Sequence, residues 1–210
     1  MPPSSRLMLQ ALLATAALGF YAPAHSAGDF ARGKELSYTC LGCHGIPDYK
    51  NVYPTYSVPE LGGQHPGYII AALKEYKSGE RSHATMHQQA ASLSDQDIED
   101  IAAYFGSDTL KATAAPVGEA PAQVALCGSC HGKNGVGITD DYPDLAGQHA
   151  DYLARALEEY KHGDRKNAIM PNFANPLTEQ DIREIAAYFS KQNPPLHTVK
   201  RRVTFLSSSD

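Results

Sequence analysis

The stretch CLGCHG occupies residues 40–45, and CGSCHG occupies residues 127–132. Each stretch places two cysteines three positions apart and a histidine directly after the second cysteine. The chain has four cysteines in all, so every one of them belongs to these two stretches. Four cysteines are too few for a disulfide-dense scaffold in 210 residues, so this spacing needs another explanation.

The CxxCH spacing is typical of c-type haem attachment. Two thiols on one helical turn can both reach the edge of a haem and bond to its vinyl groups, and the next residue then places an imidazole beneath the iron. The pattern therefore predicts two covalently bound haem c groups. The residues predicted to hold them are the thioether-forming Cys40, Cys43, Cys127 and Cys130 and the axial ligands His44 and His131.

Two other chemistries use similar residues. Redox disulfides of the thioredoxin type have CxxC pairs, but no βαβ pattern accompanies the pairs here and both histidines would be unexplained. A zinc site could use the four cysteines and two histidines, but an offset of 87 residues between the pairs suits no compact zinc module. Haem attachment is therefore the favoured interpretation.

Residues 1–27 have the pattern of a cleaved secretory signal peptide. Arg6 precedes an apolar run at 7–20, and small residues follow it. Fourteen residues are too few for a spanning helix, which takes about 20, so we expect no integral membrane segment in the mature protein. Cleavage leaves 17 basic and 23 acidic residues, a net charge of −6 that disfavours nucleic-acid binding. We expect an exported, periplasmic protein; the alternative is an uncleaved helix.

The rest of the chain repeats one unit. Residues 59–86 align with 143–170 without gaps at 15 of 28 identical positions, and 93–105 align with 177–189 at nine of 13. A linker rich in Ala, Pro and Gly lies at 106–122. We predict a first domain at 28–112, a second at 113–195 and a flexible tail at 196–210, with partner binding by the tail as the alternative.

Both copies have helical periodicity and no strand-type alternation, which predicts an all-α fold. Short helices are expected around 29–39 and 119–126, leading into the cysteine motifs. Ser94 with Asp97, and Thr178 with Asp181, resemble capping boxes. Domains of about 80 residues are small for a self-sufficient apolar core, so a haem is expected at the centre of each. The predicted core-facing stripes are Tyr68, Ile69, Ala72, Leu73, Tyr76 and their repeats Tyr152, Leu153, Ala156, Leu157, Tyr160.

Met86 and Met170 are the two methionines left after cleavage, and they occupy equivalent positions. A thioether is a soft axial ligand that raises the reduction potential of a His-ligated haem, although methionine also serves as a core filler. We expect both to lie in loops between two helices and to ligate iron. Pro171 is expected to make the loop of Met170 rigid, whereas His83 or His87 could replace Met86.

With these residues identified, the sequence resembles the cytochrome c4 family, exported bacterial proteins of two class I cytochrome c domains joined by a linker. The resemblance covers about 29–192 and rests on both CxxCH motifs, GGQ at 62–64, AGQ at 146–148, the methionine segments and the closing SDQDIEDIAAYF and TEQDIREIAAYF. It implies a tandem repeat of two cytochrome c-like domains, each a few helices around a covalent haem c. The implied axial pairs are His44/Met86 and His131/Met170. It also implies haem propionates that face each other and electron delivery to terminal oxidases.

Other repeated residues have several interpretations. Gln64-His65 and Gln148-His149 could bind propionates, shape the domain interface or cap the following helix. Arg81 and Arg165 could pair with propionates or stay solvated. Tyr104 and Tyr188 are expected to pack between helices. The acidic balance could steer the protein toward basic patches on redox partners, or only keep it soluble.

The predicted function is a diffusible two-haem electron carrier in the periplasm. It would accept electrons from a respiratory-chain donor, such as a quinol-oxidising complex, and deliver them to a terminal oxidase or reductase. No catalytic residues are predicted, and peripheral membrane association stays open. The alternatives are a cytochrome subunit of a larger dehydrogenase complex and, if the first haem has an open site, a dihaem peroxidase-like enzyme.

Overall fold

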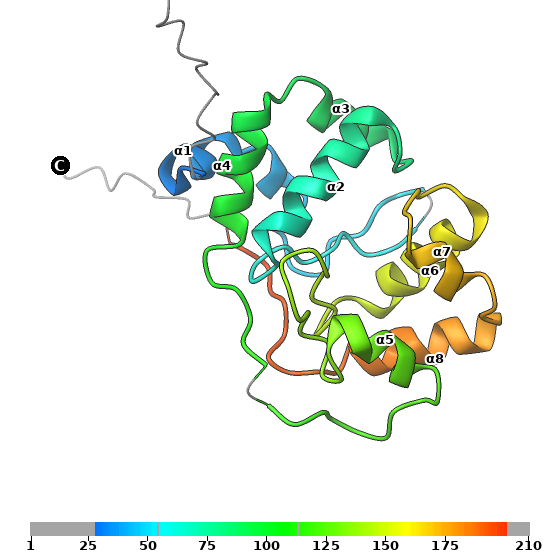
Figure 1. Ribbon diagram of the computed structural model, residues 1–210. Coiled ribbons are helices and arrows are strands. Elements are labelled where there is room, and N and C mark those ends of the chain that lie inside the picture. The colour runs from blue at the N-terminus through cyan, green and yellow to red at the C-terminus, as the bar shows by residue number, and fades with distance from the viewer. Residues whose placement is uncertain (1–27, 54, 113, 201–210) are drawn as a thin grey trace, which may run out of the picture.

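The structure is a computed structural model that describes residues 28–53, 55–112 and 114–200 (Figure 1). The predicted signal peptide at 1–27 and residues 201–210 of the predicted tail lie outside this part of the chain. The described residues form helices and three isolated bridges and no sheet, so the all-α prediction is confirmed. The elements are α1 (Phe30–Leu36), the 3₁₀ turn η1 (Cys40–Gly42), α2 (Pro66–Ser78), α3 (Ala84–Ala91), α4 (Asp95–Phe105), α5 (Val124–His131), α6 (Ala150–His162), α7 (Met170–Ala174) and α8 (Glu179–Phe189).

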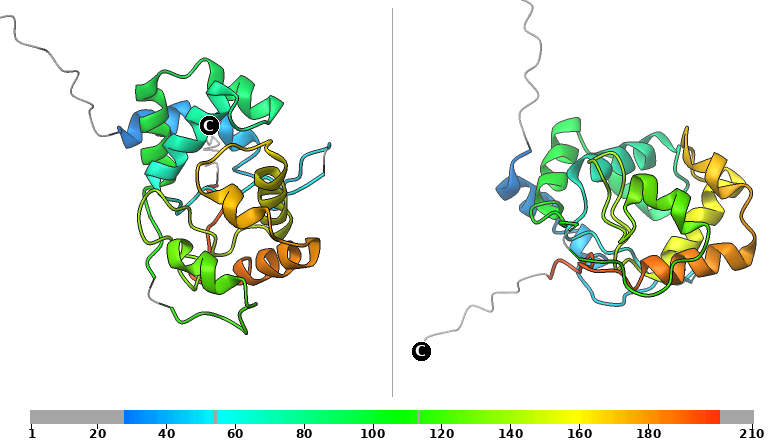
Figure 2. Two further views of the ribbon diagram at one scale, coloured as in Figure 1. Left: turned by 45° about the vertical axis from the view of Figure 1, so that its right-hand side comes forward. Right: turned by 60° about the horizontal axis from the view of Figure 1, so that its bottom comes forward.

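The helices form two groups that follow the sequence repeat. In the first, α4 packs on α1 and α2, and α2 packs on α3. In the second, α6 packs on α7 and α8. Figures 1 and 2 show the first group on one side of the molecule and the second on the other, with the 106–122 segment looping round between them. Among the described residues no helix is long and apolar enough to cross a membrane.

The repeated sequence produces repeated helix ends. Helices α2 and α6 each have 13 residues and stop at a left-handed glycine with φ of 81°, Gly79 or Gly163. Only glycine adopts this conformation without a steric penalty, so the two glycines define where both helices end. Helices α4 and α8 begin with the predicted capping boxes, which are confirmed at Ser94 and Thr178.

The apolar core is divided between the two groups. Phe105 and Phe189, each 1% exposed, occupy equivalent central positions. Tyr104 packs on Phe30 of α1 with ring centroids 5.4 Å apart, which confirms the prediction that it packs between helices. Tyr188 is 6% exposed, packs on Phe189 at 5.2 Å and donates from its hydroxyl to the carbonyl of Lys133 at 2.8 Å. In each domain the first cysteine of the CxxCH motif, Cys40 or Cys127, packs against this apolar cluster.

The entry into the cysteine motifs differs from the prediction. Helix α1 ends before Cys40, which lies in the 3₁₀ turn η1. The helix expected at 119–126 begins only at Val124 and itself carries Cys127 and Cys130. The Val124 N–H donates to the carbonyl of Pro121, so the first turn is set by this proline rather than by the residues before it.

The two methionines were predicted to lie in loops, and this prediction is wrong. Met86 lies in the first turn of α3, and Met170 is the first residue of α7. Pro171 follows in the first turn of α7, where a missing N–H costs no helical hydrogen bond. Proline therefore starts a short helix here and does not make a loop rigid.

The prediction of a flexible tail is wrong for residues 196–199. Leu196 is 3% exposed, and its N–H donates to the carbonyl of Ala146 in the second domain at 2.8 Å. His197 then pairs with Gly62 of the first domain through two backbone hydrogen bonds of 2.9 and 3.0 Å. Figure 1 shows this segment running from the end of α8 back to the first domain. Helix α8 ends at Phe189, five residues before Pro194, so the two prolines do not stop it as predicted. The extended chain that follows them joins the two domains.

We expect Leu196→Ala to lower the free energy of unfolding by about 3 kcal/mol, because the substitution opens a cavity where the segment crosses both domains. The matched control is Val52→Ala, since Val52 is 89% exposed and its loss should change stability by less than about 0.5 kcal/mol. Urea unfolding of the two variants makes the comparison, and equal stability would show that residues 196–199 are not docked.

Candidate haem sites and the interface between the domains

A cavity of about 470 Å³ lies in the second domain at its border with the first. Cys127, Cys130 and His131 line it on one side, and Met170 lines it as well. The rest of the wall is mostly apolar, with Leu145, Leu153, Leu157, Ile185 and Phe189 among its residues. The structure thus brings together all four predicted site residues of this domain around a space with apolar walls.

The two CxxCH histidines are held in the same way. Nδ1 of His44 lies 2.9 Å from the carbonyl oxygen of Pro59, and Nδ1 of His131 lies 2.9 Å from that of Pro143. A carbonyl only accepts, so Nδ1 donates its proton and Nε2 is left for a metal. Burial lowers the pKa of both imidazoles, which favours the neutral form that binds metals.

The four cysteines are free and half-buried, and none forms a disulfide. Burial raises the pKa of the Cys40 and Cys127 thiols. The first cysteine of each motif packs against the apolar cluster of its own domain. Each motif therefore presents a thiol next to the place where an apolar cofactor would complete the core.

Equivalent polar residues fix the backbone of the two methionines. The Met86 N–H donates to Nδ1 of His83 at 3.2 Å, and the Met170 N–H donates to Oδ1 of Asn167 at 2.9 Å. His83 was predicted only as a competing ligand, and Asn167 was not predicted at all. His83 is the N-cap of α3, whereas Asn167 lies two residues before the N-cap of α7 and accepts from the Ile169 and Met170 N–H groups. The signal was available, because both residues stand three positions before the methionine.

His87 has a backbone partner as well. Its Nδ1 donates to the carbonyl of Tyr76 at 2.8 Å, at the far end of α2. Met86, by contrast, packs together with Cys40 against the apolar cluster of the first domain. His83 also lies close to this motif, since its charge contributes to lowering the pKa of His44.

The residues present fit a haem in one further respect. Arg165 lines the cavity of the second domain, is 3% exposed and has an Nε without a hydrogen-bond partner. Arg81, at the equivalent position, also has a buried Nε without a partner. Buried cationic donors need an acceptor, and the carboxylate arms of a haem are acceptors of the right charge.

Comparisons with known proteins agree with this geometry. The cytochrome c family profile matches residues 30–107 and again 118–193. Cytochrome c4 of Pseudomonas aeruginosa is 35% identical over 198 residues, which cover 86% of this chain and 96% of that protein. The chain belongs to the dihaem cytochrome c4 family. Its two CxxCH motifs therefore carry two covalent haem c groups, and it is an electron-transfer protein.

Two further relatives define the likeness. The crystal structure of reduced recombinant cytochrome c4 from Pseudomonas stutzeri has a TM-score of 0.62 and 31% identity, and the match covers 79% of this chain and 100% of that one. A protein named thiosulfate dehydrogenase electron acceptor, from Stutzerimonas stutzeri strain A1501, is 32% identical over 174 residues, which cover 72% of this chain and 77% of that protein.

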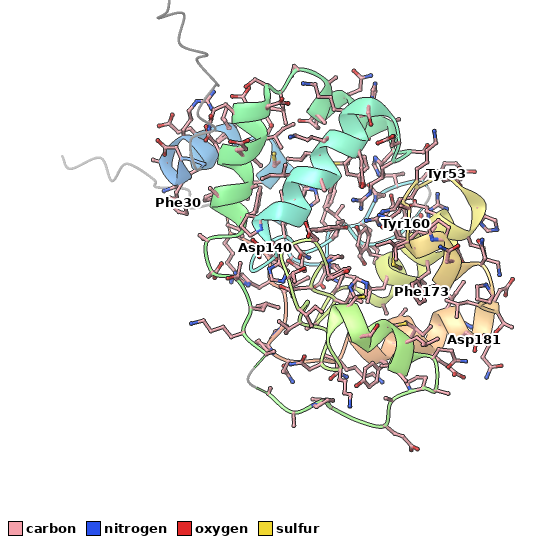
Figure 3. All side chains as sticks on the ribbon, in the orientation of Figure 1. Phe30, Tyr53, Asp140, Tyr160, Phe173 and Asp181 are labelled. Atoms are coloured by element: carbon pink, nitrogen blue, oxygen red, sulfur yellow. The ribbon has the colours of Figure 1, made fainter. Side chains whose placement is uncertain are left out.

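Arginine and tyrosine side chains form the centre of the interface between the two cytochrome domains. Arg81 donates to the Tyr152 hydroxyl across the interface at 2.6 Å, and Arg165 donates to the Tyr68 hydroxyl at the same distance. Each guanidinium also lies over a tyrosine ring of its own domain, at 4.4 and 4.5 Å from the centroid. Figure 3 shows one of these rings, Tyr160, between the two groups of helices. Both arginines are buried, so the solvated alternative is wrong.

The two glutamines form a second pair of contacts across the interface. Gln64 donates from Nε2 to the carbonyl of Asp144 and accepts from the Asp144 N–H, at 3.0 and 2.9 Å. Gln148 makes the same two bonds with Glu60, both at 3.0 Å. Of the roles considered for these glutamines, the structure supports shaping of the interface.

Histidine–carboxylate pairs lie next to the glutamines. His65 of the first domain lies 3.2 Å from Asp144 and 3.3 Å from Asp140, which Figure 3 shows beside the start of α2. His149 lies 3.4 Å from Glu60. Burial raises the pKa of Asp144 to about 6, although the Gly137 N–H and His65 act in the opposite direction. The sequence analysis missed these carboxylates, although an acid follows the repeated proline in both copies.

We expect Tyr68→Phe and Tyr152→Phe each to lower the free energy of unfolding by about 1.5–3 kcal/mol, because each leaves a buried guanidinium without its acceptor. Tyr53→Phe is the matched control, since Tyr53 is 94% exposed and should contribute less than about 0.5 kcal/mol. Thermal unfolding of the haem-loaded proteins measures the difference. Interface variants as stable as the control would contradict the docked arrangement.

Proposed function

We propose that this protein is a periplasmic electron carrier whose two haems have His/Met axial ligands. In the first domain Cys40 and Cys43 bond the haem and His44 and Met86 ligate the iron. In the second domain the corresponding residues are Cys127, Cys130, His131 and Met170. Bound haem iron supplies one-electron chemistry, alternating between the ferric and ferrous states. One observation supports this proposal: both domains repeat the same arrangement around the CxxCH motif. In each, the histidine donates to a proline carbonyl, and the methionine N–H donates to a side chain three residues earlier.

The chain's own residues prepare each site for electron transfer. The hydrogen bond from Nδ1 fixes the plane of the imidazole and its tautomer, so Nε2 would be free to ligate the iron. The hydrogen bonds to His83 and Asn167 fix the backbone of the methionine from which the thioether extends. A site held from both sides reorganises little when the charge of the iron changes, which is what a carrier needs.

Saturated iron also separates a carrier from an enzyme. A peroxidase-like reaction needs an open or exchangeable position, and loss of Met86 would create one. The packing of Met86 and Cys40 against the same apolar cluster supports Met86 as the ligand in the first domain. Arg81 and Arg165 are suited to donate hydrogen bonds to the haem carboxylates, because each has a buried Nε without a partner.

The proposed partners are redox proteins on either side of the carrier. A quinol-oxidising complex or another periplasmic donor would reduce the protein, and a terminal oxidase or reductase would oxidise it. The relative named thiosulfate dehydrogenase electron acceptor supports a second arrangement, in which a dehydrogenase is the donor or the chain is its cytochrome subunit. The signal-peptide pattern at 1–27 supports the periplasm, and the boundary between domains at 112/113 stays a prediction.

A spectroscopic redox titration of the purified protein tests the proposed ligands. We expect two low-spin haems with methionine–iron charge-transfer absorption in the ferric state, two positive potentials, and little carbon monoxide binding in the ferrous state. A high-spin component, or a low potential typical of two histidine ligands, would exclude the proposed ligand pair for that haem. Peroxide turnover would favour the enzyme alternative.

Met86→Ala and Met170→Ala assign the two signals. We expect each variant to lose the charge-transfer absorption of one haem, to lower its potential and to bind carbon monoxide at that haem only, because the thioether favours ferrous iron. A Met86→Ala protein with an unchanged spectrum would show that His83 or His87 ligates the first haem.

Asn167→Ala tests the side-chain acceptor that fixes the backbone of Met170. Loss of the acceptor for the Ile169 and Met170 N–H groups should cost about 1 kcal/mol and make the methionine–iron bond break at a lower temperature. Asn172→Ala is the control, because Asn172 is an exposed residue of the same helix. Temperature-dependent absorbance of the ferric protein follows the bond. The same breaking temperature in both variants would contradict the positioning role.

A further inference from the structure

The peptide groups that hold the two haem-binding histidines are themselves held from the other domain. The carbonyl that accepts from His131 belongs to the peptide between Pro143 and Asp144. The N–H of that same peptide donates to Oε1 of Gln64, in the first domain, at 2.9 Å. A single chain of hydrogen bonds therefore runs from the imidazole of one domain through a peptide group to a glutamine of the other.

The repeat makes the reciprocal chain. His44 donates to the carbonyl of the peptide between Pro59 and Glu60, and the N–H of that peptide donates to Oε1 of Gln148 at 3.0 Å. The two glutamines are 3% exposed, and the carbonyls they bind through Nε2 are those of Asp144 and Glu60. Each glutamine thus clamps one residue on both its N–H and its carbonyl, which fixes the preceding peptide.

We propose that Gln64 tunes the reduction potential of the haem in the second domain and that Gln148 tunes that of the haem in the first. Both are positioning residues, because they act through a peptide and a histidine and do not touch the haem. This inference rests on the proposed ligation by His44 and His131.

The direction of the effect follows from the polarity of the chain. An amide that donates from its N–H carries more negative charge on its oxygen, so hydrogen bonds in a chain strengthen one another. A stronger acceptor draws the Nδ1 proton and makes the imidazole a better electron donor through Nε2. A more basic ligand stabilises ferric iron, so the intact glutamine lowers the potential of the haem across the interface.

The coupling is reciprocal in energy as well. If the contact between Gln64 and Asp144 lowers the potential of the second haem, oxidation of that haem must strengthen the contact by the same free energy. The contact between the two domains is then stronger in the ferric protein than in the ferrous one. Each haem is tuned by the domain that carries the other haem.

A crossed set of variants in the haem-loaded full-length protein tests the proposal. We expect Gln64→Leu to raise the potential of the His131 haem more than that of the His44 haem, and Gln148→Leu to do the reverse. Haem-specific signals from the Met86→Ala and Met170→Ala proteins assign the potentials. Gln64→Asn and Gln148→Asn keep an amide but shorten its reach, so they should shift the potentials in the same crossed way even if a leucine variant does not fold.

Two further measurements separate tuning from general damage to the interface. Lys50→Gln breaks an exposed cross-domain ion pair with Asp151 at 3.1 Å and should leave both potentials in place. In the ferrous protein, the NMR signal of the Nδ1 proton of His131 should move upfield in Gln64→Leu, and that of His44 in Gln148→Leu, as each hydrogen bond weakens.

The outcomes are distinct. Suppose that the wild-type spectrum shows two His/Met haems. The inference is then overturned if a glutamine variant shifts the reduction potential only of the haem in its own domain, shifts both potentials equally, or shifts neither. A wild-type protein without two such haems would overturn the proposed ligation instead.

Discussion

The hydrogen bonds of Gln64 and Gln148 across the interface hold the two halves of this protein in one arrangement. Each glutamine binds the residue after the proline whose carbonyl accepts from a CxxCH histidine. The peptide that holds each histidine is therefore also held by the other domain. The two arginines at the centre of the interface also make reciprocal contacts, since each donates to a tyrosine of the opposite domain.

This constraint compensates for the small size of the domains. Each domain places one apolar cluster of limited extent beside its cysteine motif. The cavity beside Cys127 and Cys130 would take the haem of the second domain, and the buried polar interface fixes how the two domains lie against each other. Buried polar groups stabilise one specific arrangement only when their partners are in place. Here the contacts of Arg81 and Gln64 across the interface are matched by those of the equivalent residues Arg165 and Gln148. The segment at 196–199 adds a third connection, because it pairs with both domains.

The sequence allowed prediction of the features that depend on local patterns. The CxxCH spacing, the helical stripes and the capping boxes at Ser94 and Thr178 depend on a few neighbouring residues, and the cytochrome family, the all-α fold and the capping boxes are confirmed. The features that depend on tertiary contacts were not predictable. Burial of Arg81 requires the tyrosine of another domain, and docking of Leu196 requires backbone groups far away in the chain. Neither periodicity nor composition contains that information, although the repeat showed which positions to examine.

The most direct test of this account is amide hydrogen exchange at Glu60 and Asp144 in the haem-loaded protein. Both N–H groups lie outside helices, and each donates only to a glutamine of the other domain. Docked domains should protect both amides to a similar degree, well above that of an open loop, and Gln148→Leu and Gln64→Leu should each abolish the protection of one amide. Exchange at the rate of an open loop in the wild-type protein would contradict the reciprocal clamp.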